Sequence, residues 1–269
     1  MISLFIQDEA KKNMKAKIEL DKLLKKNDET ARRLLGDLKN DMVRMGIGED
    51  RIEIATRLRN VGLAKDILEY SQENQYDAIV IGRRGLSRLQ GMFTGSASAN
   101  IVEHSQVVPV WMVDGSVTDN KLMVAVDGSD ASLRAIDHIR FLLTGNSDFR
   151  LTLLHVVSKA SDYCEVNFDE EPSAELEEII SRQDKACFDQ FYSRAVQKFK
   201  NSGISEDQLE PVTLKKRGNT GKIILESAEK GHFGTLVIGR KGIDRAFFMG
   251  SVSRTIISRA SDRAVWLVP

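Results

Sequence analysis

A glycine-rich segment in the first half of the chain has the residues that phosphate binding requires. Gly82 and Gly85 are separated by two residues, and after nine further residues come Gly95 and Ser96. A glycine after a strand lets the backbone approach a ligand closely and adopt positive φ angles. Gly-Ser at the start of a helix offers free amide N–H groups at the positive end of the helix dipole. This spacing therefore predicts a loop that cradles a phosphate group.

The same pattern returns in the second half of the chain with a shorter loop. Gly239 and Gly242 are again two residues apart, but seven residues instead of nine separate Gly242 from Gly250, which Ser251 follows. The shorter loop puts its phosphate-binding geometry in question. Single glycines of this kind are usually turn residues. Their recurrence at matched positions, each time before Gly-Ser, favours a binding role.

A longer repeat contains both loops and predicts how they are positioned. Residues 66–85 align without gaps with residues 223–242, and residues 94–113 align with residues 249–268. In each copy an amphipathic helix precedes a short Ile/Val run, and the loop, a second helix and a last apolar run follow. Such alternation predicts a doubly wound parallel sheet. The loops are then expected at the carboxyl ends of strands, where these sheets bind ligands.

The second copy has the elements of a complete domain. Residues 121–269 predict five strands that alternate with four helices, and Ser129 or Asp130 is expected to cap the first helix. A long charged helix is predicted over residues 174–200.

The first copy has no equivalent of the first strand and first helix. Its second strand is expected at residues 2–7, a helix at 9–45 and its third strand at 51–58. Either the chain is incomplete at its N-terminus, or another element fills the gap. We expect one domain at residues 1–116, lacking its first strand and helix, and a complete domain at residues 117–269.

Charged residues beside the loops have two possible roles each. Asp127 follows the first strand of the second copy, where it either contacts a ligand or caps the next turn. Its place at the carboxyl end of a strand favours the ligand. The basic residues between the first two glycines of each loop either attract phosphate or form a solvated turn, and the sequence does not decide between these roles. They are Arg83, Arg84, Arg240 and Lys241.

The combined pattern resembles the nucleotide-binding signature of the universal stress protein family, Gly-x2-Gly-x9-Gly-Ser/Thr. The resemblance extends over nearly the whole chain, including Val-Ala-Val-Asp-Gly-Ser at residues 124–129 and the apolar run at residues 153–157. It implies an α/β fold of two flavodoxin-like, adenine nucleotide α-hydrolase-like parallel-sheet domains in tandem. It also implies ATP binding and dimers that pair through the last strand.

The family pattern gives each matching residue an expected role. Asp127 matches the acidic residue expected near the ribose or a Mg²⁺ ion, and Val156 matches the residue that packs near the adenine. The loop residues of both copies match positions that contact ribose and phosphate. These are Gly82, Gly85, Gly95, Ser96, Gly239, Gly242, Gly250 and Ser251. The expected ligand is therefore ATP or another adenine nucleotide, with Mg²⁺ as a possible companion.

Three functions compete at this point. The first is a nucleotide-binding stress or signalling module without efficient catalysis. The second is a slow ATPase of the same fold, although no Walker A motif and no catalytic triad is visible, and His155 lies in an apolar strand like a core residue. The third is a protein-interaction module that works through dimer contacts. Trp111 and Trp266 close the last strands, which we expect to pair within the chain or in a homodimer.

Composition excludes other classes. The chain has 39 basic and 39 acidic residues and a formal net charge of zero, whereas duplex-DNA binders usually carry a basic excess. The two cysteines, Cys164 and Cys187, form no metal-binding or redox pair and fit a reducing compartment. No signal peptide or membrane-spanning run is visible. We therefore expect a cytoplasmic protein with neither nucleic acid nor membrane as its partner.

Overall fold

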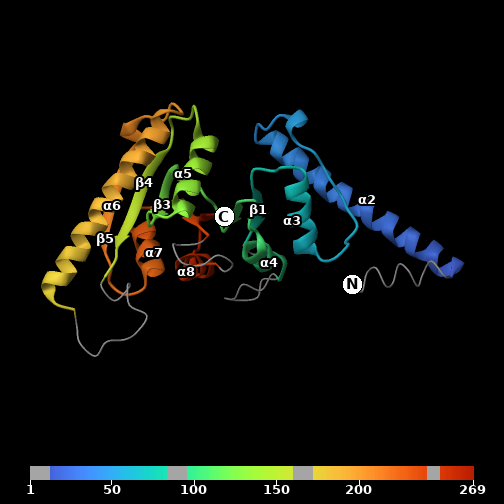
Figure 1. Ribbon diagram of the computed structural model, residues 1–269. Coiled ribbons are helices and arrows are strands. Elements are labelled where there is room, and N and C mark those ends of the chain that lie inside the picture. Colours follow the sequence, from blue (N-terminus) through green and yellow to red (C-terminus); the bar gives the residue numbers. More distant parts are fainter. Residues whose placement is uncertain (1–12, 84–95, 160–171, 241–248) are drawn as a thin grey trace. The chain divides into compact units, whose positions relative to one another are not determined.

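The computed structural model describes residues 13–83, 96–159, 172–240 and 249–269 (Figure 1). Contacts divide the chain into two compact units, Met1–Ile67 and Leu68–Pro269. The domains expected from the sequence have a different boundary, at residues 116 and 117, and that division stays a prediction.

The first unit consists largely of one long helix, α2 (Met14–Arg44). The Asn13 side chain caps it by accepting hydrogen bonds from the backbone N–H groups of Lys15 and Ala16. The 3-10 turn η1 (Glu49–Arg51) follows. The helix predicted at residues 9–45 is thus confirmed from Met14 onward. The strand predicted at residues 2–7 lies outside the described residues.

The strand predicted at residues 51–58 is wrong. After η1 the chain continues without regular structure, although Ile52, Ile54 and Thr56 are half-buried and alternate with exposed residues. Thr56 Oγ1 donates a hydrogen bond of 2.5 Å to Asp28 of α2. Alternation places one side of the segment against a neighbour, but a strand also needs a partner for its backbone groups. No described strand pairs with this segment.

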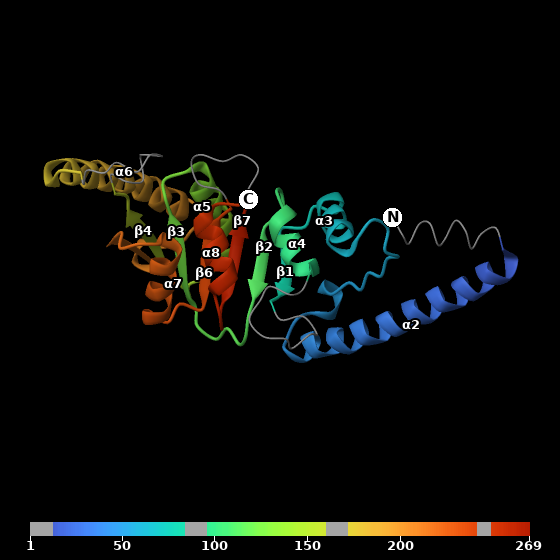
Figure 2. The same cartoon turned by 90° about the horizontal axis from the view of Figure 1, so that it is seen from below.

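The second unit is built on one seven-stranded sheet, in the order β1-β2-β7-β6-β3-β4-β5 (Figures 1 and 2). Its strands are β1 (Ile79–Gly82), β2 (Val110–Val113), β3 (Lys121–Val126), β4 (Arg150–Val157), β5 (Leu209–Lys215), β6 (Thr235–Gly239) and β7 (Ala264–Val268). Its helices are α4 (Ser96–His104), α5 (Asp130–Leu143), α6 (Ala174–Lys200), α7 (Thr220–Lys230) and α8 (Ser251–Arg259), with the 3-10 turn η3 (Glu206–Gln208). The unit boundary falls within α3 (Leu63–Glu73).

Residues 121–269 form the predicted five-stranded domain. Strands β3 to β7 are mutually parallel, and counted within this copy their order is 3-2-1-4-5. Ser129 caps α5 by accepting a hydrogen bond from Ser132 N, which confirms one of the two predicted caps. The helix predicted over residues 174–200 is α6. The core lies where α5 and α6 cover the sheet, and includes Val124, Ile136, Leu153, Phe199 and Val237.

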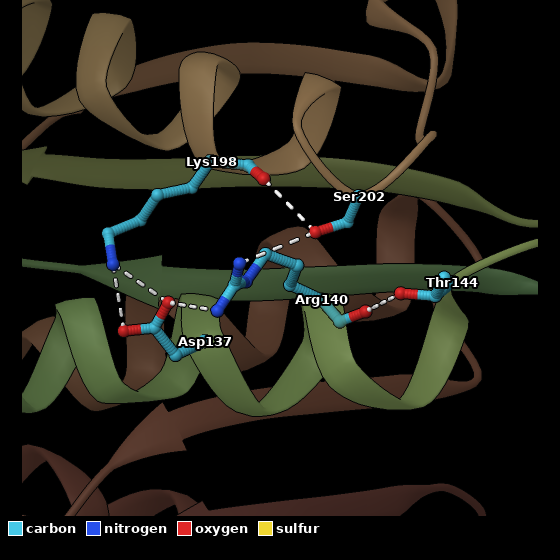
Figure 3. A network of polar contacts seen from close by, with 5 residues as sticks. All are labelled: Asp137, Arg140, Thr144, Lys198 and Ser202. Atoms are coloured by element: carbon cyan, nitrogen blue, oxygen red, sulfur yellow. Dashed lines mark hydrogen bonds and ion pairs between the residues drawn. The ribbon is translucent and has the colours of Figure 1, made fainter.

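Helices α5 and α6 also share a polar network on their outer side (Figure 3). Lys198 Nζ reaches both carboxylate oxygens of Asp137, at 2.8 and 2.9 Å, and Arg140 approaches the same carboxylate at 3.4 Å. The Asp137 and Lys198 side chains are each 39% exposed. Ion pairs this open to water contribute at most about 1 kcal/mol, so the apolar core beneath them fixes the helix packing.

Strands β2 and β7 are the last strands of the two copies, and they pair antiparallel. Trp111 lies opposite Trp266 in the register. The two indole rings stack with centroids 4.4 Å apart and planes 12° apart. Trp111 Nε1 also donates a hydrogen bond of 3.1 Å to Nε2 of His138, on α5.

Candidate nucleotide site

A cavity of about 190 Å³ lies at the carboxyl ends of β3, β4 and β6. The position is the crevice between the first and fourth strands of the copy, where the strand order reverses and open α/β sheets bind ligands. Whole ligand pockets usually measure roughly 300–1,000 Å³, so the volume enclosed by the described walls is smaller than that of a typical ligand pocket. These walls are formed by Ala125, Val126, Asp127, Ser132, Leu154, Val156, Thr220, Ile224, Ile238, Gly239 and residues 250–253.

Asp127 supplies the carboxylate among these walls. Its Oδ1 accepts hydrogen bonds from Ser129 N at 3.0 Å and from Ser132 Oγ at 2.7 Å. Asp127 N in turn donates to Ser132 Oγ at 3.1 Å. These contacts fix the turn between β3 and α5, as expected for a capping residue. Both of the side-chain contacts use Oδ1, while the residue as a whole is exposed. Asp127 thus caps the turn and also lines the cavity.

The N-terminus of α8 forms another part of the wall. Gly250 is its N-cap residue, and Gly250 N donates to Arg240 O at 3.0 Å. Ser253 Oγ donates to Gly239 O at 2.7 Å, which joins the first turn of the helix to the end of β6. The free N–H groups and the positive helix dipole at this end favour an anionic ligand.

Gly239 is required by close packing. A Cβ atom built on it would lie 2.9 Å from the Cβ of Ala131 and 3.1 Å from its carbonyl carbon. Glycine therefore lets the end of β6 pass directly beneath α5.

Half of the residues predicted for the site come together here. Asp127, Val156, Gly239, Gly250 and Ser251 line the one cavity. The other half belongs to the loop of the first copy or falls outside the described residues. Gly82 ends β1 and is exposed, and Ser96 begins α4. Gly85, Gly95 and Gly242 lie outside the described residues.

Part of the lining was not predicted from the sequence. Thr220 and Ile224 reach the cavity from the first turns of α7, and Ser132 does so from α5. The repeat predicted the helix α7 itself, because its counterpart precedes the glycine loop of the first copy at the same distance, but it did not mark the residues of α7 that line the cavity. Arg83 and Arg240 were expected either to attract phosphate or to lie in a solvated turn, and neither role describes their side-chain contacts. Their guanidinium groups bind helix ends: Arg83 reaches Ser258 O, and Arg240 is buried.

His155 is a hydrogen-bonded core residue, as predicted. Its Nδ1 lies 3.0 Å from Val126 O, and its Nε2 lies 2.9 Å from Asp184 Oδ2. Its ring stacks on Phe188 with centroids 5.0 Å apart. Both ring nitrogens are therefore engaged on the side of β4 that faces α6. His155 supports the strand end next to Asp127 without lining the cavity.

Comparison with known proteins agrees with this architecture. A model of the universal stress protein family matches residues 7–114 and again residues 120–269. The structure of a universal stress protein from Archaeoglobus fulgidus DSM 4304 is similar with a TM-score of 0.59 at 20% identity, over 92% of this chain and 79% of that chain. The structure of a functionally unknown protein from Pseudomonas aeruginosa PAO1 is similar with a TM-score of 0.60 at 15% identity, over 88% of this chain and 77% of that chain. No curated protein sequence matches the chain.

Two matches to one family model cover most of the sequence, so the chain belongs to the universal stress protein family. It is a tandem member with two flavodoxin-like α/β domains.

Among the described residues, every helix is too short or too polar to cross a bilayer. Nor do these residues contain a cluster of three or more His, Cys, Asp or Glu side chains that could coordinate a metal ion.

Proposed function

We propose that the second copy binds an adenine nucleotide and that the protein works as a nucleotide-binding stress or signalling module without efficient catalysis. One observation carries the proposal. Asp127, Val156, Gly239 and the Gly250–Ser251 pair come from four separate segments of the sequence, yet they line one cavity. That cavity lies at the strand reversal, where doubly wound sheets bind ligands.

The chemistry of the walls suits the parts of a nucleotide. Leu154, Val156 and Ala125 offer an apolar surface for a base. The N-terminus of α8 offers N–H groups and a positive dipole to phosphate. Asp127 would contact the ribose or a Mg²⁺ ion. Mg²⁺ is commonly held by one or two carboxylates together with the phosphates of its ligand, so a single aspartate fits a Mg²⁺–nucleotide.

We also propose that residues 1–116 and 117–269 act as paired domains. The antiparallel register of β2 and β7 and the Trp111–Trp266 stack support pairing within one chain. This pairing already uses the last strand of each copy. A homodimer through the same strands would have to replace it, and the molecular mass of the protein in solution distinguishes the two arrangements.

Calorimetric titration with ATP and Mg²⁺ tests the binding proposal, after an aliquot has been denatured to detect nucleotide that co-purifies. Binding near one equivalent per chain is expected. Absence of both heat and co-purified nucleotide contradicts the proposal and favours a protein-interaction module. Phosphate release over many turnovers in the same samples would favour the ATPase.

Matched serines identify the copy that binds. Ser251→Asp places a carboxylate at the start of α8, where it repels phosphate but agrees with the helix dipole, so the fold is retained. We expect nucleotide binding to weaken at least tenfold, equivalent to about 1.4 kcal/mol. Ser96→Asp is the control at the matching position of the first copy and should leave binding unchanged. Loss of binding in Ser96→Asp alone would assign the nucleotide to the first copy.

A further inference from the structure

Arg83 extends from the first copy to a helix of the second. It is the residue after the first loop glycine, and its backbone N–H continues the sheet by donating to Val113 O at 2.9 Å. Its side chain leaves the loop: Nη2 donates to Ser258 O at 2.6 Å, and Nη1 lies 3.7 Å from the carboxylate of Asp114. Ser258 is the penultimate residue of α8. Arg83 therefore holds the C-terminal end of α8.

Arg240 makes the reverse connection. It occupies the same position in the second loop, and its backbone N–H donates to Val268 O at 2.7 Å. Its guanidinium donates to Val102 O at 2.6 Å and also to Glu103 O. Both carbonyls belong to the last turn of α4, in the first copy. Arg240 is only 1% exposed, so this contact is part of the protein interior.

These contacts satisfy groups that a helix leaves open. The last carbonyls of a helix have no partner within it, and they carry the negative end of the helix dipole. An arginine offers several N–H donors and a permanent positive charge to such an end. Arg83 has the Asp114 carboxylate in addition, whereas the residue matching Asp114 in the second copy is Pro269. Burial lowers the pKa of the Arg240 guanidinium, while the negative charge of Glu103, in the last turn of α4, acts in the opposite sense.

The two arginines and two helices form a closed chain of contacts. The helix α8 begins with Gly250–Ser251 at the cavity of the second copy and ends at Arg83, where the loop of the first copy starts. The helix α4 begins at Ser96, where that loop ends, and finishes at Arg240, where the loop of the second copy starts. Each loop is thus attached to the helix that follows the other loop.

We propose that the two copies position each other's phosphate-binding helices, with Arg83 of the first copy acting as the positioning residue for α8. The ligand part of this inference rests on the proposed nucleotide binding. Arg83 does not contact the ligand: it fixes one end of a nine-residue helix, and the other end carries the N–H groups offered to phosphate. The first copy then serves as the support of the second site.

Arg83→Met tests this proposal, with Arg259→Met as the control. Arg259 is an exposed residue at the same end of α8, so its loss removes an equal charge from the same place. In the ligand-free protein, amide hydrogen exchange over residues 251–259 is expected to accelerate in Arg83→Met and not in Arg259→Met. The Kd for ATP should rise about fivefold to tenfold in Arg83→Met alone, within the range of ordinary coupling between sites. Arg83→Lys keeps one donor and the charge, and should restore part of both effects.

The possible results separate the two proposals. If the wild-type protein binds no nucleotide, the proposed function fails, but the exchange of α8 still decides whether Arg83 positions it. Unchanged exchange and unchanged Kd in Arg83→Met would overturn the inference. Acceleration throughout the second unit would show a general structural role instead and would also overturn it. If Arg83→Met does not fold, Arg83→Lys provides the same test against the wild type.

Discussion

Strands β6 and β1 have almost the same sequence, with Leu-Val-Ile-Gly ending β6 and Ile-Val-Ile-Gly forming β1, but different surroundings. β6 lies between β3 and β7 under α5, and the Val237 side chain is fully buried. β1 pairs with β2 on one side, and no other described strand pairs with it. Val80, which matches Val237 in the repeat, is 62% exposed. The neighbours of a strand, more than its own residues, therefore decide what each position contributes.

The same difference separates the two glycine loops. The cavity of the second copy needs β3, β4 and α5, which supply Asp127, Val156 and Ser132. Among the described residues, the first copy contains no counterpart of β3 and α5. Its arginine, Arg83, instead holds α8 of the second copy. Matched positions in the repeat can be used to test how far this division of roles extends.

The largest contrast is expected from lysine at the matched valines. Val237→Lys would bury an ammonium group beneath α5. Groups at such sites show pKa shifts of 3–5 units, equivalent to about 4–7 kcal/mol, which is comparable with the whole stability of a domain. We expect this variant not to fold, as measured by circular dichroism and urea unfolding.

Val80→Lys is the partner of that variant and should change the free energy of unfolding by no more than about 0.5 kcal/mol. Lysine is also a residue that natural edge strands use against aggregation. A loss of several kcal/mol in Val80→Lys would show that another element covers β1 in solution, and the comparison would then have to be revised.

Alanine at the matched glycines should give an intermediate contrast. In Gly239→Ala the new methyl group would lie 2.9 Å from the Cβ of Ala131. The shifts needed to remove such overpacking typically lower the free energy of unfolding by about 1–3 kcal/mol. At Gly82 nothing lies within 4 Å of the built Cβ atom. Gly82→Ala should therefore be neutral or stabilising by about 0.5 kcal/mol, because it restricts the unfolded chain. Thermal unfolding of both variants measures the difference, and equal losses would contradict it.

The smallest expected effect concerns pH and the two tryptophans. Trp111 donates a hydrogen bond to His138, and burial lowers the pKa of His138 below 6.5, although the nearby Asp77 acts in the opposite sense. The unfolded chain then binds a proton between pH 6.5 and the lower pKa of the folded state, while the folded protein does not. The contribution of neutral His138 to the free energy of unfolding is therefore fully present above pH 6.5, and it decreases as the pH falls through this window.

His138→Gln removes the titrating group and keeps an acceptor for Trp111. The wild-type Tm should therefore decrease more than the Tm of the variant between pH 7.5 and pH 5.5. Parallel decreases in the two proteins would assign the pH dependence to other groups.

Much of the second copy could be predicted from its sequence. Five strands and a long helix over residues 174–200 were expected in this copy, and they are β3 to β7 and α6. Long runs of one periodicity determine the type of an element with little help from tertiary contacts. The motifs also marked residues that line the cavity, as at Asp127 and Gly250, and their contact with a nucleotide stays a prediction.

Predictions from the sequence failed where a feature depended on contacts with a distant part of the chain. Residues 51–58 alternate like a strand, but backbone hydrogen bonding requires a second strand, and local sequence does not encode its presence. Thr220 lines the cavity from a helix whose own sequence carries no ligand signal. Arg83 and Arg240 look like phosphate-binding residues, but where a long side chain ends depends on the fold around it.

The sequence by itself determined that the chain is a duplication, that its second half is a complete doubly wound domain, and which glycines could face a ligand. Local periodicity and short-range turn chemistry are sufficient for these conclusions. The tertiary structure alone decided that β2 and β7 pair, that one valine of the repeat is buried and the other exposed, and that each arginine reaches into the other copy. These features join residues more than a hundred positions apart, and burial and hydrogen bonding there depend on the assembled sheet.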